Sequence, residues 1–396
     1  MRRIFAYTAL LLSCVVSFCQ AERPDVSGYL ESRHAVQTRS SNDILASETR
    51  LRLEAGISGE NTSAFISGNL SKSHLEQADD TTTSELHEAY IDFAGNGWDL
   101  RAGRQIIIWG NSDGVQVTDV LCPSDLSEFA TRDLDEIRLP VDALNIRYTG
   151  SGDVTLEAVL IPFFEAAQLP DSQSPWRVGP ASPLPNTPET PDRRIGNGEA
   201  GVRASWFLPG ADISLSWARI WNDLPVKGET GLSYKRTSFA GLTASIPLDA
   251  FVLRGEAAWF SDAFKTAADG GADIETPLTR ALVGIDWYPG GSWTLSMQFL
   301  QETALENRAD MAADGHSELF TFRASKKVMR EKIEISDMAY VTANDLDLFN
   351  RFSVDFEVED GFHIMGGCDL FFGPSDSSYG RYRDNTQVWA RAKFHF

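Results

Sequence analysis

The chain has 396 residues, with 35 basic and 56 acidic side chains and a formal net charge of −21. Such an acidic excess argues against a nucleic-acid partner, because binding phosphates requires a basic surface. Of the 4 cysteines, Cys14 and Cys19 lie near the N-terminus, so Cys122 and Cys368 could form at most one bridge, which excludes a disulfide scaffold.

Residues 1–21 have the features of an export signal. A pair of arginines precedes an apolar stretch that ends at Phe18, and Ala21 completes a small-residue cleavage site. A lipoprotein signal ending at Cys14 is the alternative, although the apolar stretch continues beyond it. We therefore expect residues 22–396 to form one exported domain.

Alternation of apolar and polar residues recurs from end to end, while helical periodicity is nearly absent. The clearest examples are residues 50–57, 154–160, 200–206, 251–259 and 352–358. No later segment is apolar over the length of a membrane-spanning helix, so a membrane protein with this sequence must be a closed barrel. Counting segments predicts an all-β, antiparallel barrel of about 18 strands, with about 16 as the alternative.

Short and long connections alternate along the chain. Tight turns such as Asn96-Gly97, Pro209-Gly210 and Asp360-Gly361 separate longer connections at 38–46, 74–83, 110–141, 162–197, 222–229, 262–277, 304–315, 343–346 and 373–385. This asymmetry is typical of outer-membrane barrels, which have short periplasmic turns and long extracellular loops. The connection 162–197 holds eight of the 17 prolines, and we expect an extended surface loop there, or a lid.

Aromatic residues gather where strands would meet the two membrane interfaces, as the aromatic belts of barrels do. Those expected at the turn side are Trp98, Trp206, Phe251, Trp287, Trp293, Phe362 and Phe396, and those expected at the loop side are Trp109, Trp221 and Trp259. A soluble all-β protein with these rings in its core is the alternative.

The chain ends in the alternating segment WARAKFHF, residues 389–396. We expect it to be the last strand, closing the barrel against the first strand near Val26 to Gln37. The final Phe396 resembles the C-terminal signature of bacterial outer-membrane proteins. That signature implies recognition by the barrel-assembly machinery.

The connection 110–141 is too long for a simple hairpin, and loops of this length are usually functional. We expect it to fold into the lumen, with a helix from Ser124 to Arg138 capped by Ser124 or Asp125; a surface-lying loop is the alternative. Its candidate constriction residues are Asp113, Asp119, Asp125, Asp133, Asp135 and Glu136. The candidate lumen-wall residues are Arg50, Arg52, Arg101, Arg147, Arg203 and Arg254.

We expect the loop acids to pair with wall arginines such as Arg101 and Arg147, because charged pairs shielded from bulk water are strong. Rings of wall charges can also set pore selectivity. The alternative is that the wall charges pair across neighbouring strands and serve the fold alone.

One stretch resembles a known family. Gly103-Arg104-Gln105, Trp109-Gly110, Asp119, Pro123-x-Asp125-Leu126 and Leu139-Pro140-Val141 are similar to the signature of the outer-membrane family called domain of unknown function 1302. The resemblance implies a proteobacterial outer-membrane barrel that acts as a channel or transporter, including for hydrophobic molecules. A periplasmic or inner-membrane transport system is then an expected partner.

We therefore expect a channel that passes a small or hydrophobic solute across the outer membrane, in contact with lipid and lipopolysaccharide. A general-diffusion porin and a structural or adhesive barrel are the alternatives. The histidines are scattered and no nucleophile elbow or paired-histidine metal motif occurs, so we expect no enzyme, no cofactor and no metal site. Calcium binding by the acidic loops stays open, and we expect no bridge between Cys122 and Cys368.

Overall fold

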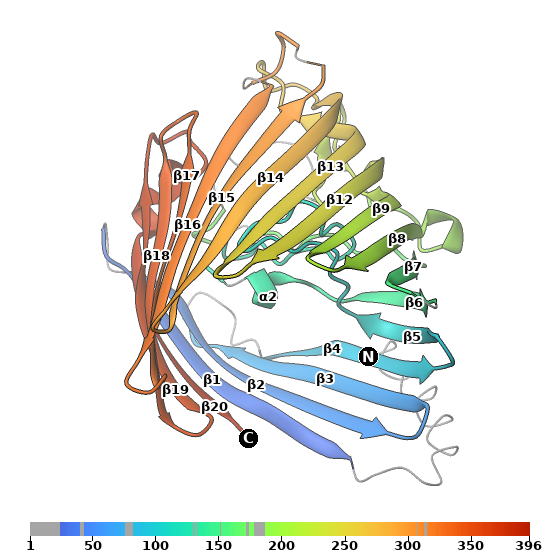
Figure 1. Ribbon diagram of the computed structural model, residues 1–396. Helices are drawn as coiled ribbons and strands as arrows, with labels where there is room; N and C mark the ends of the chain where they lie inside the picture. Colours follow the sequence, from blue (N-terminus) through green and yellow to red (C-terminus); the bar gives the residue numbers. More distant parts are fainter. Residues whose placement is uncertain are drawn as a thin grey trace.

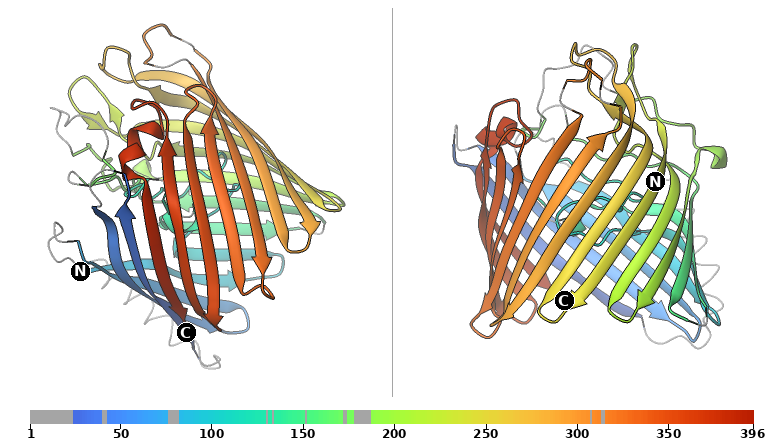
Figure 2. Two further views of the ribbon diagram at one scale, coloured as in Figure 1. Left: turned by 90° about the vertical axis from the view of Figure 1, so that its left-hand side faces the viewer. Right: turned by 45° about the horizontal axis from the view of Figure 1, so that its top comes forward.

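The computed structural model describes residues 24–396 except 40–42, 76–81, 130, 133, 151, 172–173, 178–186, 307 and 313–314. The export signal expected at 1–21 lies outside the described residues. Eighteen antiparallel strands form one closed sheet, which confirms the predicted barrel and strand number (Figure 1). The strands cross the ring obliquely (Figure 2), as barrel closure requires.

The barrel strands follow one another around the ring in chain order. They are β1 (Asp25–Gln37), β2 (Ile44–Ser58), β3 (Thr62–Ser73), β4 (Thr82–Ala94), β5 (Trp98–Gln105), β6 (Val141–Thr149), β7 (Val154–Ile161), β8 (Glu199–Leu208), β9 (Ala211–Trp221), β12 (Arg236–Leu248), β13 (Phe251–Lys265), β14 (Ile274–Gly290), β15 (Trp293–Ala304), β16 (His316–Val328), β17 (Ile333–Thr342), β18 (Leu348–Glu359), β19 (Phe362–Phe372) and β20 (Gln387–His395).

The remaining elements lie in the long connections. They are the small hairpin β10 (Val226–Lys227) and β11 (Leu232–Ser233), the single helical turn α2 (Leu134–Ile137), and the 3-10 turns η1 (Ile195–Asn197) and η2 (Gly380–Asn385). No helix in the described part of the chain is both long and apolar enough to cross a membrane. We call the end of the barrel with short turns the turn end, and the opposite end the loop end.

The first and last strands close the ring. β20 pairs with β1 in an unbroken register from Tyr29 opposite His395 to Gln37 opposite Gln387. Beyond the strand, Gly28 N–H donates to the carbonyl of Phe396, and Phe396 N–H donates back to Gly28, each at 3.0 Å. Phe396 therefore lies at the turn end of the barrel, beside the start of β1.

The apolar faces of the strands point out of the barrel and the polar faces point into the lumen, the reverse of a soluble β-barrel. Leu156, Val202 and Leu215 point outward and are each 51% exposed. Glu157 and Glu256 point inward and are 4% and 3% exposed. An outward apolar band with a polar interior is the pattern of a membrane barrel.

Candidate functional site

The connection between β5 and β6, residues 106–140, enters the lumen, and we call it the cross-lumen loop. Ile106 N–H leaves the strand ladder and donates to the wall carboxylate Glu88 at 3.0 Å. The indole N–H of Trp109 donates to Glu157 at 3.1 Å, and its ring belongs to a buried cluster that includes Phe239 of β12. The expectation that β5 continues to Trp109 and places it in an aromatic belt is therefore wrong, because the indole is paired inside the barrel.

Glu256 of β13 accepts four hydrogen bonds from the described part of this loop. One carboxylate oxygen accepts from the backbone N–H groups of Asn111 and Ser112, at 2.7 and 2.6 Å. The other accepts from the backbone N–H and the hydroxyl of Thr118, at 3.0 and 2.7 Å. A buried carboxylate with four donors is well satisfied, so Glu256 fixes the first half of the loop.

Two of the candidate constriction acids reach the barrel wall. Asp113 pairs with Arg323 of β16 at 2.5 Å, and Glu136 pairs with Arg391 of β20 at 2.8 Å. Burial raises the pKa of the Glu136 carboxyl, but the Arg391 guanidinium outweighs that effect and the net pKa is lowered. Asp133 lies outside the described residues.

The other candidate acids pair within the loop. Asp119 and Asp135 both bind Arg138, at 2.7 and 2.5 Å, and Asp125 lies 3.4 Å from Arg132. The Asp135 side chain is also 92% exposed. These three acids therefore shape the loop itself.

The candidate wall arginines divide into two groups. Four pair with carboxylates of the wall: Arg50 with Glu48 at 3.1 Å, Arg52 with Glu54 at 3.6 Å, Arg101 with Asp92 at 2.7 Å and Arg147 with Glu157 at 3.3 Å. Arg101 and Arg147 do not bind the loop acids as expected, because each lies directly opposite its wall partner in the strand register.

Two of the six arginines do contact the loop, through its backbone carbonyls. Arg254 donates to the carbonyl of Asn111 at 2.8 Å. Arg203 donates to those of Ile108 and Trp109, at 3.4 and 3.5 Å. Both arginines also hold a wall carboxylate, so they link the loop to the wall network.

A second anchor, which sequence reasoning missed, is formed by Glu128. It pairs with Arg33 of β1 and, at 2.5 Å, with Arg132, which also lies 3.7 Å from Glu48 of β2. Burial raises the pKa of the Glu128 carboxyl, but Arg33 and Arg132 outweigh that effect and the net pKa is lowered. The inward position of Arg33 follows from strand alternation, whereas nothing local indicates Glu128 as its partner.

The expected helix from Ser124 to Arg138 is wrong except for the single turn α2. Ser124 and Arg138 instead form an antiparallel bridge, and Asp125 N–H donates to the carbonyl of Ile137 at 2.6 Å. Gln168 of the proline-rich connection donates its N–H to the carbonyl of Ser124 at 3.0 Å and accepts from Leu126 N–H at 2.8 Å. The backbone groups at the two ends of the segment therefore bond to each other and to a neighbouring connection, and not along a helix.

Aromatic side chains join the cross-lumen loop to two other connections. Phe129 stacks on Tyr382 of η2, with ring centroids 4.2 Å apart and planes at 22°. Trp176 of the proline-rich connection lies 6.0 Å from Tyr382 and 5.9 Å from Phe371. Part of that connection lies outside the described residues, but the aromatic cluster ties its described part to the loop.

The residues that carried the family resemblance turn the chain into the lumen. Gly103 has a φ of +130°, and a Cβ there would lie 2.2 Å from the carbonyl oxygen of Ala89. The buried Gln105 amide donates to Gly103 and Ala143 carbonyls, at 3.2 and 3.0 Å. Asp119 accepts from Trp109 N–H at 3.2 Å.

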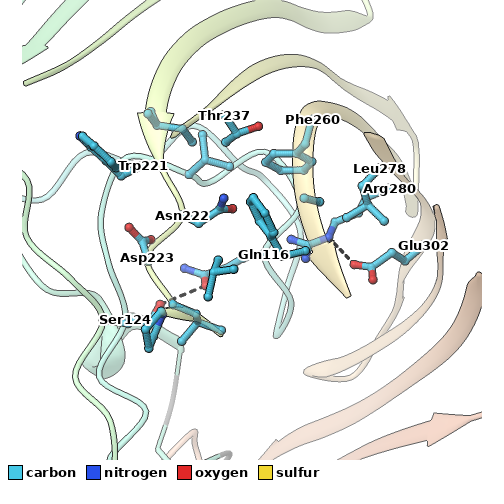
Figure 3. A pocket seen from close by; sticks show the side chains of 18 of the residues that line it. Gln116, Ser124, Trp221, Asn222, Asp223, Thr237, Phe260, Leu278, Arg280 and Glu302 are labelled. Carbon is cyan, nitrogen blue, oxygen red and sulfur yellow. Dashed lines mark hydrogen bonds and ion pairs between the residues drawn. The ribbon is translucent and has the colours of Figure 1, made fainter. Parts of the chain in front are cut away.

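A cavity of about 430 Å³ opens at the loop end of the lumen, between the cross-lumen loop and the inner wall of β9 and β12 to β15 (Figure 3). Its lining combines apolar side chains such as Phe260 and Leu278 with charged ones, which are Asp119, Asp223, Lys265, Asp273, Arg280 and Glu302. Among the described residues, no group of three or more His, Cys, Asp and Glu side chains could hold a metal ion.

Comparison with known proteins gives a family and a fold. A family model described as "Protein of unknown function (DUF1302)" matches residues 39–383. No match was found among curated proteins.

Several solved structures share the fold. Acinetobacter baumannii OccAB3 has a TM-score of 0.58 at 8% identity, over 94% of this chain and 99% of that chain. Pseudomonas aeruginosa OpdK with vanillate has a TM-score of 0.56 at 9% identity, over 95% and 98%. Pseudomonas aeruginosa OccK8 (OprE) has a TM-score of 0.55 at 8% identity, over 94% and 97%.

Proposed function

The chain belongs to the DUF1302 family, and we propose that it is an outer-membrane channel whose lumen is restricted by the cross-lumen loop. A barrel of 18 strands is wide enough for an aqueous path. The outward apolar face suits a lipid environment, and the inward face is polar. OpdK, one of the proteins of similar fold, was solved with vanillate, which is consistent with passage of a small organic solute.

One observation carries this proposal: the cross-lumen loop is bonded to strands on several sides of the ring. Its contacts are Glu256 on β13, Arg323 on β16, Arg391 on β20 and Arg33 on β1. A loop held at these strands must cross the lumen, and it therefore limits what passes. A general-diffusion porin would leave a wider permanent path.

Deletion of residues 111–138, with a short glycine linker in their place, tests the proposal. Purified parent and deletion variant are reconstituted in liposomes, swelling is followed with sugars of increasing size, and heat-modifiable migration verifies that each barrel is assembled. We expect the parent to admit only the smallest solutes and the deletion to admit larger ones faster.

Three outcomes would contradict the proposal. Equal swelling of the two proteins would place the loop outside the path. Rapid swelling by the parent with large sugars would support a general-diffusion porin. An assembled deletion variant that passes nothing would support a structural or adhesive barrel.

A further inference from the structure

Two cations share one carboxylate on the wall of the loop-end cavity. Glu302 of β15 lies between two cations: Arg280 of β14, whose Nε is 2.7 Å from it, and Lys265 of β13. One carboxylate therefore neutralises only one of the two. Among the described residues, no acceptor other than Glu302 binds the Arg280 guanidinium, so its two terminal nitrogens remain available.

Three other acids line the cavity: Asp119, which pairs with Arg138 at 2.7 Å, Asp273, which accepts from the backbone N–H of Lys227 at 2.8 Å, and Asp223. Asp223 lies across the cavity from Arg280, with Gln116 between them (Figure 3). Burial, and secondly the nearby Glu199, raise the pKa of the Asp223 carboxyl well above its ordinary value. A raised pKa favours the neutral acid, which donates a hydrogen bond instead of repelling an anion.

A further donor has no partner inside the protein. The side-chain oxygen of Gln116 accepts from the Ser124 hydroxyl at 3.1 Å, whereas its Nε2 is buried and bonds to no described residue. Buried donors are normally paired, and one that is not is explained by a missing ligand or water. The cavity therefore offers several donors to an acceptor-rich solute.

Much of the remaining lining is apolar, although it also includes the polar side chains of Asn222 and Thr237. Val120, Ile220, Phe260, Phe264 and Leu278 surround the polar groups, and the Arg280 guanidinium lies 5.4 Å from the centre of the Phe260 ring. Sites for small organic molecules have this composition, with a mainly apolar lining and a few polar groups that fix orientation. An inorganic anion would leave the apolar lining unused.

We propose that this cavity binds a small organic acid, with the carboxylate at Arg280 and Lys265 and the apolar body against Phe260 and Leu278. Arginine suits this role because its planar guanidinium matches a carboxylate with two parallel hydrogen bonds. A neutral solute of the same shape would leave these donors unpaired on desolvation, so it should bind more weakly. The inference deepens the proposed function, on which it rests, by naming the class of solute.

Calorimetric titration of the full barrel in detergent tests the inference, with benzoate as the probe and benzamide as its neutral match. We expect benzoate to bind at least about tenfold more tightly than benzamide, because a charge-assisted pair is worth that much. Arg280→Gln should weaken benzoate binding by about tenfold or more. Glu302→Gln should preserve or strengthen it, because it removes the anion that competes for the same cations.

Arg219→Gln is the matched control. Arg219 lies on β9 between the lumen-facing Ala218 and Ile220, which are 0% and 4% exposed, so its side chain is on the outer face of the barrel. The control loses the same charge outside the lumen and should bind benzoate as the parent does.

Several results would overturn the inference. Equal binding of benzoate and benzamide would show that charge is not recognised. Displacement of benzoate by an equal concentration of chloride would indicate an unspecific anion site. Loss of binding in both Arg280→Gln and Glu302→Gln would indicate that the ion cluster is structural. Swelling in parallel separates the two proposals: a channel that restricts solutes without binding benzoate refutes only this inference.

Discussion

Glu256→Gln tests whether one wall carboxylate holds the cross-lumen loop in the lumen. The two oxygens of Glu256 accept four hydrogen bonds from the loop, from Asn111, Ser112 and twice from Thr118. A glutamine has nearly the same shape but presents an NH2 group to one of the two donor pairs. The substitution therefore changes the bonding of the loop and leaves the wall geometry intact.

The expected magnitude follows from the number of bonds. Hydrogen bonds to a charged group contribute about 1.5–3 kcal/mol each, and neutral ones about 1 kcal/mol. The variant loses one or two of the four bonds and weakens the others, so we expect loop docking to lose about 3 kcal/mol. At about 1.4 kcal/mol per factor of ten, the undocked fraction should rise about 100-fold.

Cys122 provides the assay. Its side chain is 3% exposed, and burial raises the thiol pKa to about 12 although Ile107 N–H donates to its sulfur at 3.2 Å. The thiolate is the reactive species, so Cys122 should be labelled only when the loop undocks. Cys368 is also a free thiol, and Cys368→Ser in all variants leaves one thiol in the described chain. We expect N-ethylmaleimide at pH 8 to label Cys122 about 100-fold faster in Glu256→Gln.

Glu54→Gln is the matched control, because Glu54 is a lumen-wall carboxylate that pairs with Arg52 at 3.6 Å and bonds to no described residue of the loop. Its labelling rate should equal that of the parent. An assembled Glu256→Gln barrel that labels at the parental rate would show that Glu256 does not hold the loop. Equally fast labelling of both variants would indicate a general loosening of the barrel.

Three other predictions concern topology, assembly and pH. A protease site inserted at Asp192 should be cut on intact cells and one at Asn96 should not, and cleavage only at Asn96 would refute the orientation of the loop end. Removal of Phe396 should lower the yield of heat-modifiable barrel severalfold, because its backbone makes the last two bonds to β1; an unchanged yield would remove the role of the closing residue. The pKa of Glu128 is lowered in the docked loop, so its ion pairs stabilise docking at pH values above the ordinary pKa of a glutamate. This stabilisation is lost as the pH falls below about 4. Swelling rates measured from pH 7 to pH 3 should therefore rise at the acid end, and Glu128→Gln should flatten that rise.

The wall of the barrel was predictable because its signals are local. A strand with one face towards lipid must alternate at every second residue, and this pattern is readable without knowing its neighbours. The pairing of β20 with β1 followed from closure, since the free edges of the first and last strands of a closed barrel have only each other to pair with. The inward position of Glu256 also followed from alternation along β13.

The bonds of the cross-lumen loop were not predictable in the same way. Arg323 and Arg391 bind acids that lie 210 and 255 positions away in the chain. Arg101 and Arg147 also face the lumen by alternation, but each pairs with a carboxylate of the adjacent strand. Alternation determines which arginines face the lumen, whereas the path of the loop determines which of them it meets.

Under the two proposals, restriction and selectivity depend on different parts of this chain. Gly103, Gln105 and Asp119, which carried the family resemblance, bend the chain inward and fix the base of the loop. Arg280 and Glu302, which form an ion pair on the cavity wall, lie on β14 and β15, far from that stretch along the chain. A substitution in the first group should change how much passes, and one in the second should change which solute is favoured. The loop can therefore keep its docking contacts while the wall of the cavity varies.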